Sequence, residues 1–221
     1  MIPYTRIFSA LLVVALLPAI HALAESRWEP SIQKFEAADA ENMPAPGGIV
    51  FVGSSSMVYW KTDKDFPEHN IINRGFGGSH TSDSLEFADR IIIKYKPRIV
   101  AIYAGDNDIA AGKSIETVVD DTKKLFAYIH DALPETKIIY VAIKPSLARW
   151  NLVDKMRAAN AAIEAITEKD ERMQFLDIDT PSLGADGKPC KELFVGDGLH
   201  LSAEGYSVWN KLMRPLLAAK D

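Results

Sequence analysis

The sequence has little of what would anchor several common classes of protein. Cys190 is the only cysteine, so the chain cannot form an internal disulfide and its stability must come from a hydrophobic core. This thiol lies in a loop rich in glycine and proline with no predicted strand before it, and we interpret it as incidental. The net charge is −5 and no dense cluster of lysine and arginine occurs, which argues against binding of a nucleic-acid backbone.

Recognised metal-binding patterns are also missing from the sequence. It contains no His-Glu-x-x-His motif and no cysteine pair, and its five histidines are scattered. The run Asp-Asn-Asp at 106–108 lacks the glycine and glutamate of a calcium-binding loop. We therefore expect neither a metal ion nor a cofactor.

A long apolar run occurs only at the amino terminus. Arg6 precedes an almost unbroken apolar segment at 7–20, and the small residues Ala-Leu-Ala follow at 22–24. This run is shorter than the roughly 20 residues that a membrane-spanning helix needs. We interpret residues 1–24 as a secretory signal peptide, and we expect a periplasmic or extracellular protein with no stable membrane span after its removal. Because Arg6 is the one charged residue in that segment, removal changes the net charge from −5 to −6.

The rest of the chain, 25–221, is predicted to form one domain, because 48% hydrophobic and 25% charged residues suit a chain with a sizeable core. Residues 25–46 are polar and end in a segment rich in proline and glycine, so we expect the core to begin with the strand that follows. Short apolar runs without alternation predict strands buried on both faces, at 49–52, 71–72, 99–103, 138–143 and 175–178.

Stretches with helical spacing lie between these runs. Ser114 and Ser202 are candidate caps for two of the helices, and a third apolar stripe runs over 153–166. Strand and helix thus alternate, which predicts an α/β protein with a central parallel sheet in a three-layer α/β/α sandwich. Ligands of such sheets bind at the carboxyl ends of the strands.

Short polar segments follow the first three predicted strands. The first, Gly-Ser-Ser-Ser at 53–56, offers a hydroxyl after a sharp turn, although similar turns end many strands. The second, at 73–79, is rich in glycine, but His80 stands where a dinucleotide fingerprint requires glycine or alanine. The third contains Asn107, whose side chain either donates to a developing oxyanion or forms an Asx turn before the next helix.

An aspartate and a histidine lie close together near the carboxyl end. Asp197 precedes His200 by three residues, so its carboxylate can reach the imidazole if the segment makes one helical turn. Such a carboxylate fixes the tautomer of the imidazole and stabilises the imidazolium that forms when histidine takes a proton from serine. The alternative is a hydrogen-bonded surface histidine.

In this order along an alternating chain, the four segments resemble those of the SGNH branch of the GDSL esterases and lipases, especially its small secreted members, over about 49–206. The resemblance implies a flavodoxin-like sandwich with Ser55 as nucleophile, His200 as base and Asp197 as the residue that orients the base. It also implies an oxyanion hole made by the amides of Ser55 and Gly78 and the side chain of Asn107.

The match has one departure and one additional segment. Ser54 replaces the aspartate that usually precedes the serine, so the literal Gly-Asp-Ser-Leu signature is absent, and Ser55 rather than Ser54 or Ser56 is the aligned nucleophile. The segment Lys144–Trp150 is similar to a loop that follows the fourth strand in such enzymes, and its role is left open.

The resemblance implies hydrolysis of short-chain or acetyl esters, with a small molecule or a glycan ester as substrate. A lysophospholipase or thioesterase of the same fold and a non-catalytic carbohydrate-binding protein are the alternatives. An α/β-hydrolase is disfavoured, because Met57 occupies the second glycine position of its Gly-x-Ser-x-Gly elbow. The sequence carries no signal for an oligomeric state.

Overall fold

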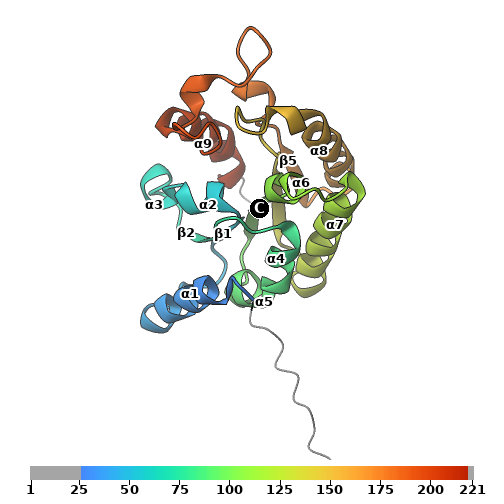
Figure 1. Ribbon diagram of the computed structural model, residues 1–221. Helices are drawn as coiled ribbons and strands as arrows, with labels where there is room; N and C mark the ends of the chain where they lie inside the picture. The colour runs from blue at the N-terminus through green and yellow to red at the C-terminus, as the bar shows by residue number, and fades with distance from the viewer. Residues whose placement is uncertain (1–25, 219–221) are drawn as a thin grey trace, which may run out of the picture.

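The computed structural model describes residues 26–218 and shows a five-stranded sheet with helices on both faces (Figure 1). The predicted signal peptide lies outside the described residues. All strand pairs are parallel, and the strand order is β2-β1-β3-β4-β5. This is the flavodoxin-like order, so the predicted α/β/α sandwich is confirmed. The strands are β1 (Ile49–Gly53), β2 (Ile71–Gly75), β3 (Ile99–Tyr103), β4 (Lys137–Val141) and β5 (Met173–Leu176).

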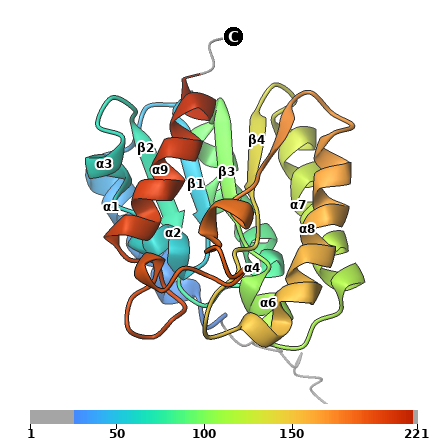
Figure 2. The same cartoon turned by 90° about the horizontal axis from the view of Figure 1, so that it is seen from above.

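The helices form the two outer layers, with α9 on one side of the sheet and α1 and α5 on the other (Figure 1). Figure 2 shows α9 crossing in front of the sheet. The helices are α1 (Glu29–Glu41), α2 (Ser55–Tyr59), α3 (Thr62–Asp65), α4 (Thr81–Glu86), α5 (Ala88–Ile91), α6 (Asp106–Ala110), α7 (Ile115–Ala132), α8 (Val153–Thr167) and α9 (Ala203–Leu217).

Every residue of β1 and β3 is buried, as the runs without alternation predict. Neighbouring residues of one strand enter different cores: Val50 belongs to the core on the α1 side, and Phe51 belongs to the core that contains Trp209 of α9. Both predicted caps are present, because the Ser114 hydroxyl accepts from the Thr117 amide and the Ser202 hydroxyl from the Gly205 amide, each at 3.2 Å. Among residues 26–218, no helix combines the length and apolar character needed to cross a membrane.

The expectation that the core begins after the polar segment at 25–46 is wrong. Helix α1 occupies much of that segment, and its Ile32 is completely buried in the core on that side of the sheet. The helix carries only a narrow apolar face, and part of its attachment is ionic. Asp39, 7% exposed, accepts hydrogen bonds from Arg74 and from the Tyr95 hydroxyl, both at 2.5 Å.

This carboxylate is stabilised in its charged form. Burial acts to raise the pKa of Asp39, but the hydrogen bonds from Lys94 and Tyr95 and the charge of Arg74 outweigh burial, and the pKa is lowered. The ion pair between Asp39 and Lys94 measures 2.5 Å. Helix α1 is therefore held by cations from elsewhere in the chain, which its own sequence pattern does not reveal.

Candidate active site

The first serine segment turns sharply from β1 into α2. Gly53 ends the strand with φ +136°, and a Cβ at this position would lie only 1.9 Å from the carbonyl oxygen of Tyr103. Only glycine fits this approach of β1 to β3. The turn makes Ser55 the first residue of α2, at the carboxyl end of the sheet.

The glycine-rich segment after β2 lies against this serine. An ideal Cβ on Gly77 would be 3.8 Å from the Ser55 Cβ, and Gly78 adopts φ +78°, a left-handed conformation that favours glycine. Ser55 is the first residue of its helix, where an amide has no carbonyl partner within the helix. No carbonyl among residues 26–218 accepts from the amides of Ser55 and Gly78, so both can bind a ligand.

Asn107 lies in α6, directly after β3, and the alternative of an Asx turn before the following helix is wrong. Its Nδ2 donates to the Ser79 carbonyl at 3.0 Å. Its Oδ1 accepts from both terminal nitrogens of Arg149, at 3.2 Å each. One N–H of the carboxamide thus remains without a partner in the described part of the chain.

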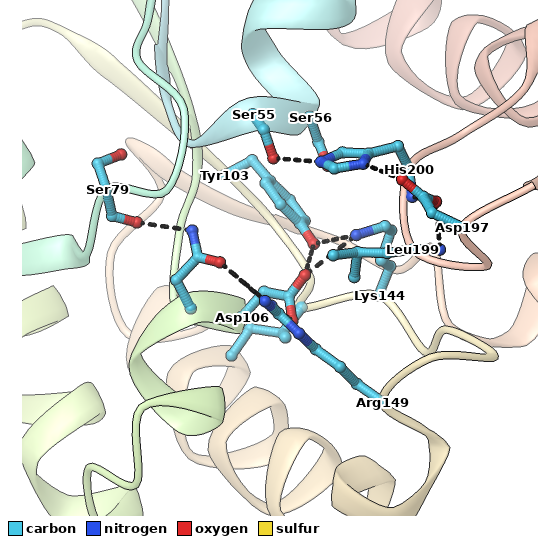
Figure 3. A network of polar contacts seen from close by, with 12 residues as sticks. Ser55, Ser56, Ser79, Tyr103, Asp106, Lys144, Arg149, Asp197, Leu199 and His200 are labelled. Atoms are coloured by element: carbon cyan, nitrogen blue, oxygen red, sulfur yellow. Dashed lines mark hydrogen bonds and ion pairs between the residues drawn. The ribbon is translucent and has the colours of Figure 1, made fainter. Parts of the chain in front are cut away.

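His200 reaches the serine from the segment before α9. This segment pairs with an earlier stretch through the bridge between Phe194 and Leu201, and the Val195 amide donates to the His200 carbonyl at 2.9 Å. The imidazole Nε2 lies 2.9 Å from the Ser55 Oγ (Figure 3). The ring also makes an edge-to-face contact with Tyr59, with centroids 5.0 Å apart.

Asp197 lies on the other side of the imidazole. Its Oδ2 is 2.6 Å from the His200 Nδ1, and its Oδ1 accepts from the amides of Leu199 and His200 at 2.8 and 2.9 Å. The expected helical turn does not form, because Gly198 has φ +66°, and an Asx turn brings the two side chains together instead. The hydrogen bond from the His200 side chain, with those from the two amides, lowers the pKa of Asp197 to about 2.

The structure therefore brings Ser55, His200 and Asp197 into one hydrogen-bonded series. A neutral imidazole that donates from Nδ1 to the carboxylate leaves Nε2 to accept the serine proton. Ser54 and Ser56 are buried, with 3% and 2% of their surface exposed, and neither bonds to the imidazole. Of the three neighbouring serines, Ser55 is the one placed to lose its proton to His200.

Sequence reasoning missed a polar network beneath Asn107. Asp106 lies between Lys144 and Arg149, and the Tyr103 hydroxyl completes the group (Figure 3). Two signals pointed toward it: the acidic residue that precedes the candidate asparagine, and the basic residues of the loop after the fourth strand. Neither indicates a partner, because Lys144 and Arg149 lie 38 and 43 positions from Asp106.

Comparisons with known proteins agree with this fold. The chain is 24% identical over 201 residues to platelet-activating factor acetylhydrolase IB subunit alpha2 of Gallus gallus, covering 87% of this chain and 82% of that protein. A solved structure from Streptococcus pneumonia, provisionally assigned as a platelet activating factor, superposes with TM-score 0.77 at 23% identity, covering 86% of this chain and 92% of the other. A GDSL-like lipase from Bacteroides thetaiotaomicron superposes with TM-score 0.72 at 21% identity, covering 84% and 96%.

The model of the GDSL-like lipase/acylhydrolase family matches residues 57–208, which include the Gly78, Asn107, Asp197 and His200 segments and begin two residues after Ser55. The match spans more than half of the chain. It confirms the family resemblance that the motif segments indicate. This protein therefore belongs to the GDSL-like lipase/acylhydrolase family and is a serine ester hydrolase.

Proposed function

We propose that the protein hydrolyses short acyl esters, acetyl esters above all, through an acyl-enzyme formed on Ser55. The observation that carries this proposal is the series of contacts from Ser55 Oγ to His200 Nε2 at 2.9 Å and from His200 Nδ1 to Asp197 at 2.6 Å. Such a series supplies an activated nucleophile, its base and the group that orients the base.

In the first half of the reaction, the Ser55 oxygen attacks the ester carbonyl carbon while His200 Nε2 takes the hydroxyl proton. Asp197 stabilises the imidazolium, and its lowered pKa keeps it ionised in that role. When the tetrahedral intermediate collapses, the carbon–oxygen bond to the leaving alcohol breaks and His200 returns the proton to that oxygen. The acyl group then remains on Ser55.

In the second half, water replaces the alcohol as the reactant. His200 takes a proton from the water as the water oxygen attacks the acyl carbon. It then gives that proton to the Ser55 oxygen as the ester bond to Ser55 breaks. The products are the carboxylic acid and the free enzyme. Each half passes through one oxyanion, so the same donors serve twice.

The proposed oxyanion donors are the amides of Ser55 and Gly78 and the side chain of Asn107. The two amides have no carbonyl partner among the described residues, and one N–H of the Asn107 carboxamide is unused. Fixed donors of this kind stabilise negative charge without reorganisation during the reaction.

Two observations support a short acyl group. The Gallus gallus relative is by its name an acetylhydrolase. The groups that contact the Asn107 carboxamide are also polar, namely the Ser79 carbonyl and the Arg149 guanidinium. A long alkyl chain lying against such polar groups would find little apolar surface to cover, whereas an acetyl methyl needs little.

Acetyl groups on a sugar polymer are the proposed natural substrate, and the predicted export of the chain supports this. A second candidate, an amphiphilic ester such as a lysophospholipid, is favoured by the surface around the site. Of the six large apolar side chains that are exposed in the described part of the chain, four belong to segments that carry or contact the proposed triad: Val58, Tyr59, Leu147 and Val195.

The test is hydrolysis of p-nitrophenyl acetate, butyrate and octanoate by wild type, Ser55→Ala and the neighbouring control Ser54→Ala. We expect the fastest turnover with acetate, loss of activity in Ser55→Ala, and near wild-type activity in Ser54→Ala. An unchanged rate in folded Ser55→Ala protein would remove the nucleophile assignment. Acetate release from acetylated glycans supports the first substrate, and faster cleavage of lysophospholipid supports the second.

A further inference from the structure

The loop Lys144–Trp150 has no part in the reaction proposed above. It contributes two cations, Lys144 and Arg149, beneath the proposed oxyanion hole. Lys144 is 1% exposed, and a buried ammonium needs partners to remain charged. Its Nζ donates to the Tyr103 hydroxyl at 3.0 Å and to Asp106 Oδ2 at 3.1 Å. The lysine therefore anchors the start of the loop to the first residue of α6.

Asp106 connects this lysine to the second cation. Its Oδ2 also accepts from the Tyr103 hydroxyl at 3.2 Å, and its Oδ1 accepts from Arg149 at 2.6 Å. Burial acts to raise the pKa of Asp106, but the charges of Lys144 and Arg149 outweigh it, and the pKa is lowered. The carboxylate is thus ionised with both oxygens fixed, and it holds the guanidinium in place.

The guanidinium in turn holds the carboxamide of Asn107. Both terminal nitrogens of Arg149 donate to Asn107 Oδ1 at 3.2 Å, while Asn107 Nδ2 donates to the Ser79 carbonyl at 3.0 Å. An asparagine amide rotates readily about its last torsion, and a half-turn would exchange the oxygen and the NH₂ group. With a cation at its oxygen, the amide keeps the NH₂ group on the side of Ser79.

We propose that Arg149 is a positioning residue for the oxyanion hole, which fixes and polarises the Asn107 carboxamide so that its unused N–H donates to the tetrahedral oxyanion. This inference rests on the proposed function, because it assigns Asn107 to that hole. It gives the loop after β4 a role in the reaction without contact with the reacting atoms. Lys144 and Asp106 serve the same arrangement by holding Arg149.

A double-mutant cycle tests the assignment. Arg149→Met is made in wild type and in Asn107→Ala, and Arg172→Met is the matched control, because Arg172 forms a similar pair with Asp170 at 2.9 Å at the amino end of β5. We expect Arg149→Met to lower kcat for p-nitrophenyl acetate about tenfold, with little change in KM. This loss is smaller than the ~10²–10³-fold loss expected when the Asn107 donor itself is removed. In the Asn107→Ala background, the same substitution should change kcat by less than about twofold.

Several results would overturn the assignment. Equal losses in both backgrounds would show that Arg149 acts independently of Asn107, and a change confined to KM would make it a substrate-binding residue. Arg149→Lys, which can donate from one nitrogen only, should retain an intermediate kcat. If Arg149→Met does not fold, Arg149→Gln takes its place in the cycle. If the losses from Arg149→Met and Asn107→Ala are additive and Ser55→Ala is inactive, this inference alone is refuted. Activity in Ser55→Ala would instead refute the proposed function.

Discussion

Replacement of Asn107 by alanine removes the one side-chain donor of the proposed oxyanion hole. Loss of one such donor typically costs about 10²–10³ in kcat, or roughly 2.7–4 kcal/mol of transition-state stabilisation. The amides of Ser55 and Gly78 would still serve the oxyanion. We therefore expect kcat for p-nitrophenyl acetate to fall by about 10²–10³ without complete loss of hydrolysis.

The same substitution also removes a hydrogen-bond partner from two polar groups in the folded protein. The Ser79 carbonyl loses a donor at 3.0 Å, and the Arg149 guanidinium loses an acceptor at 3.2 Å. Ser79 is completely buried, and a buried polar group without a partner costs about 1–3 kcal/mol. Urea unfolding should therefore show a loss of stability of about that size.

Asn107→Asp separates the two effects. An aspartate keeps an oxygen toward Arg149 but replaces the NH₂ donor with a second oxygen that carries negative charge. Its kcat should fall below that of Asn107→Ala, because a carboxylate repels the developing oxyanion, while the pairing with Arg149 is kept. Wild-type kcat in folded Asn107→Ala, or a higher kcat in the aspartate variant than in the alanine variant, would exclude Asn107 as an oxyanion donor.

Three further predictions follow from other contacts. Asp197→Asn keeps an oxygen that accepts hydrogen bonds from the two amides of the turn but loses the carboxylate beside His200. We expect kcat to fall about 10²–10⁴-fold with an unchanged circular dichroism spectrum. A near wild-type kcat would exclude Asp197 as the residue that orients His200. Gly53→Ala puts a Cβ 1.9 Å from the Tyr103 carbonyl oxygen, so thermal unfolding should show a loss of about 4 kcal/mol or more, and unchanged stability would contradict the turn geometry. Because the pKa of Asp39 is lower in the folded protein than in the unfolded chain, the stabilisation from Asp39 is complete above about pH 5 and is lost as the pH falls below about 4. Asp39→Asn should therefore flatten the dependence of the unfolding free energy on pH in that window. An equally steep dependence in the variant would refute this contribution of Asp39.

The layers of the fold were predictable from local patterns. Apolar runs without alternation mark β1 and β3, because both faces of these strands are covered by helices. The caps Ser114 and Ser202 mark the starts of α7 and α9, because a serine hydroxyl there accepts a free amide of the first turn. Each of these signals lies within a few residues of the feature that it predicts.

Features that depend on distant partners were not predictable in this way. Helix α1 is attached partly through Asp39, whose partner Arg74 lies 35 positions away. No periodic pattern in the sequence links these two residues. The turn that joins Asp197 to His200 depends on side-chain acceptance of backbone amides, which a spacing of three residues does not distinguish from a helical turn. The contact of Arg149 with Asn107 spans 42 positions. It requires β3 and β4, which precede these residues, to be paired in the sheet.

The proposed reaction depends on the Ser55 hydroxyl, activated by His200, as the nucleophile. Its most direct test is the mass of the native protein and of its peptides after reaction with a fluorophosphonate ester, which reacts covalently with an activated serine. We predict one adduct per chain on Ser55, absent from Ser55→Ala and from heat-denatured wild type. An adduct on Ser54, Ser56 or Cys190 in its place, or active wild-type protein without an adduct, would exclude Ser55 as the nucleophile.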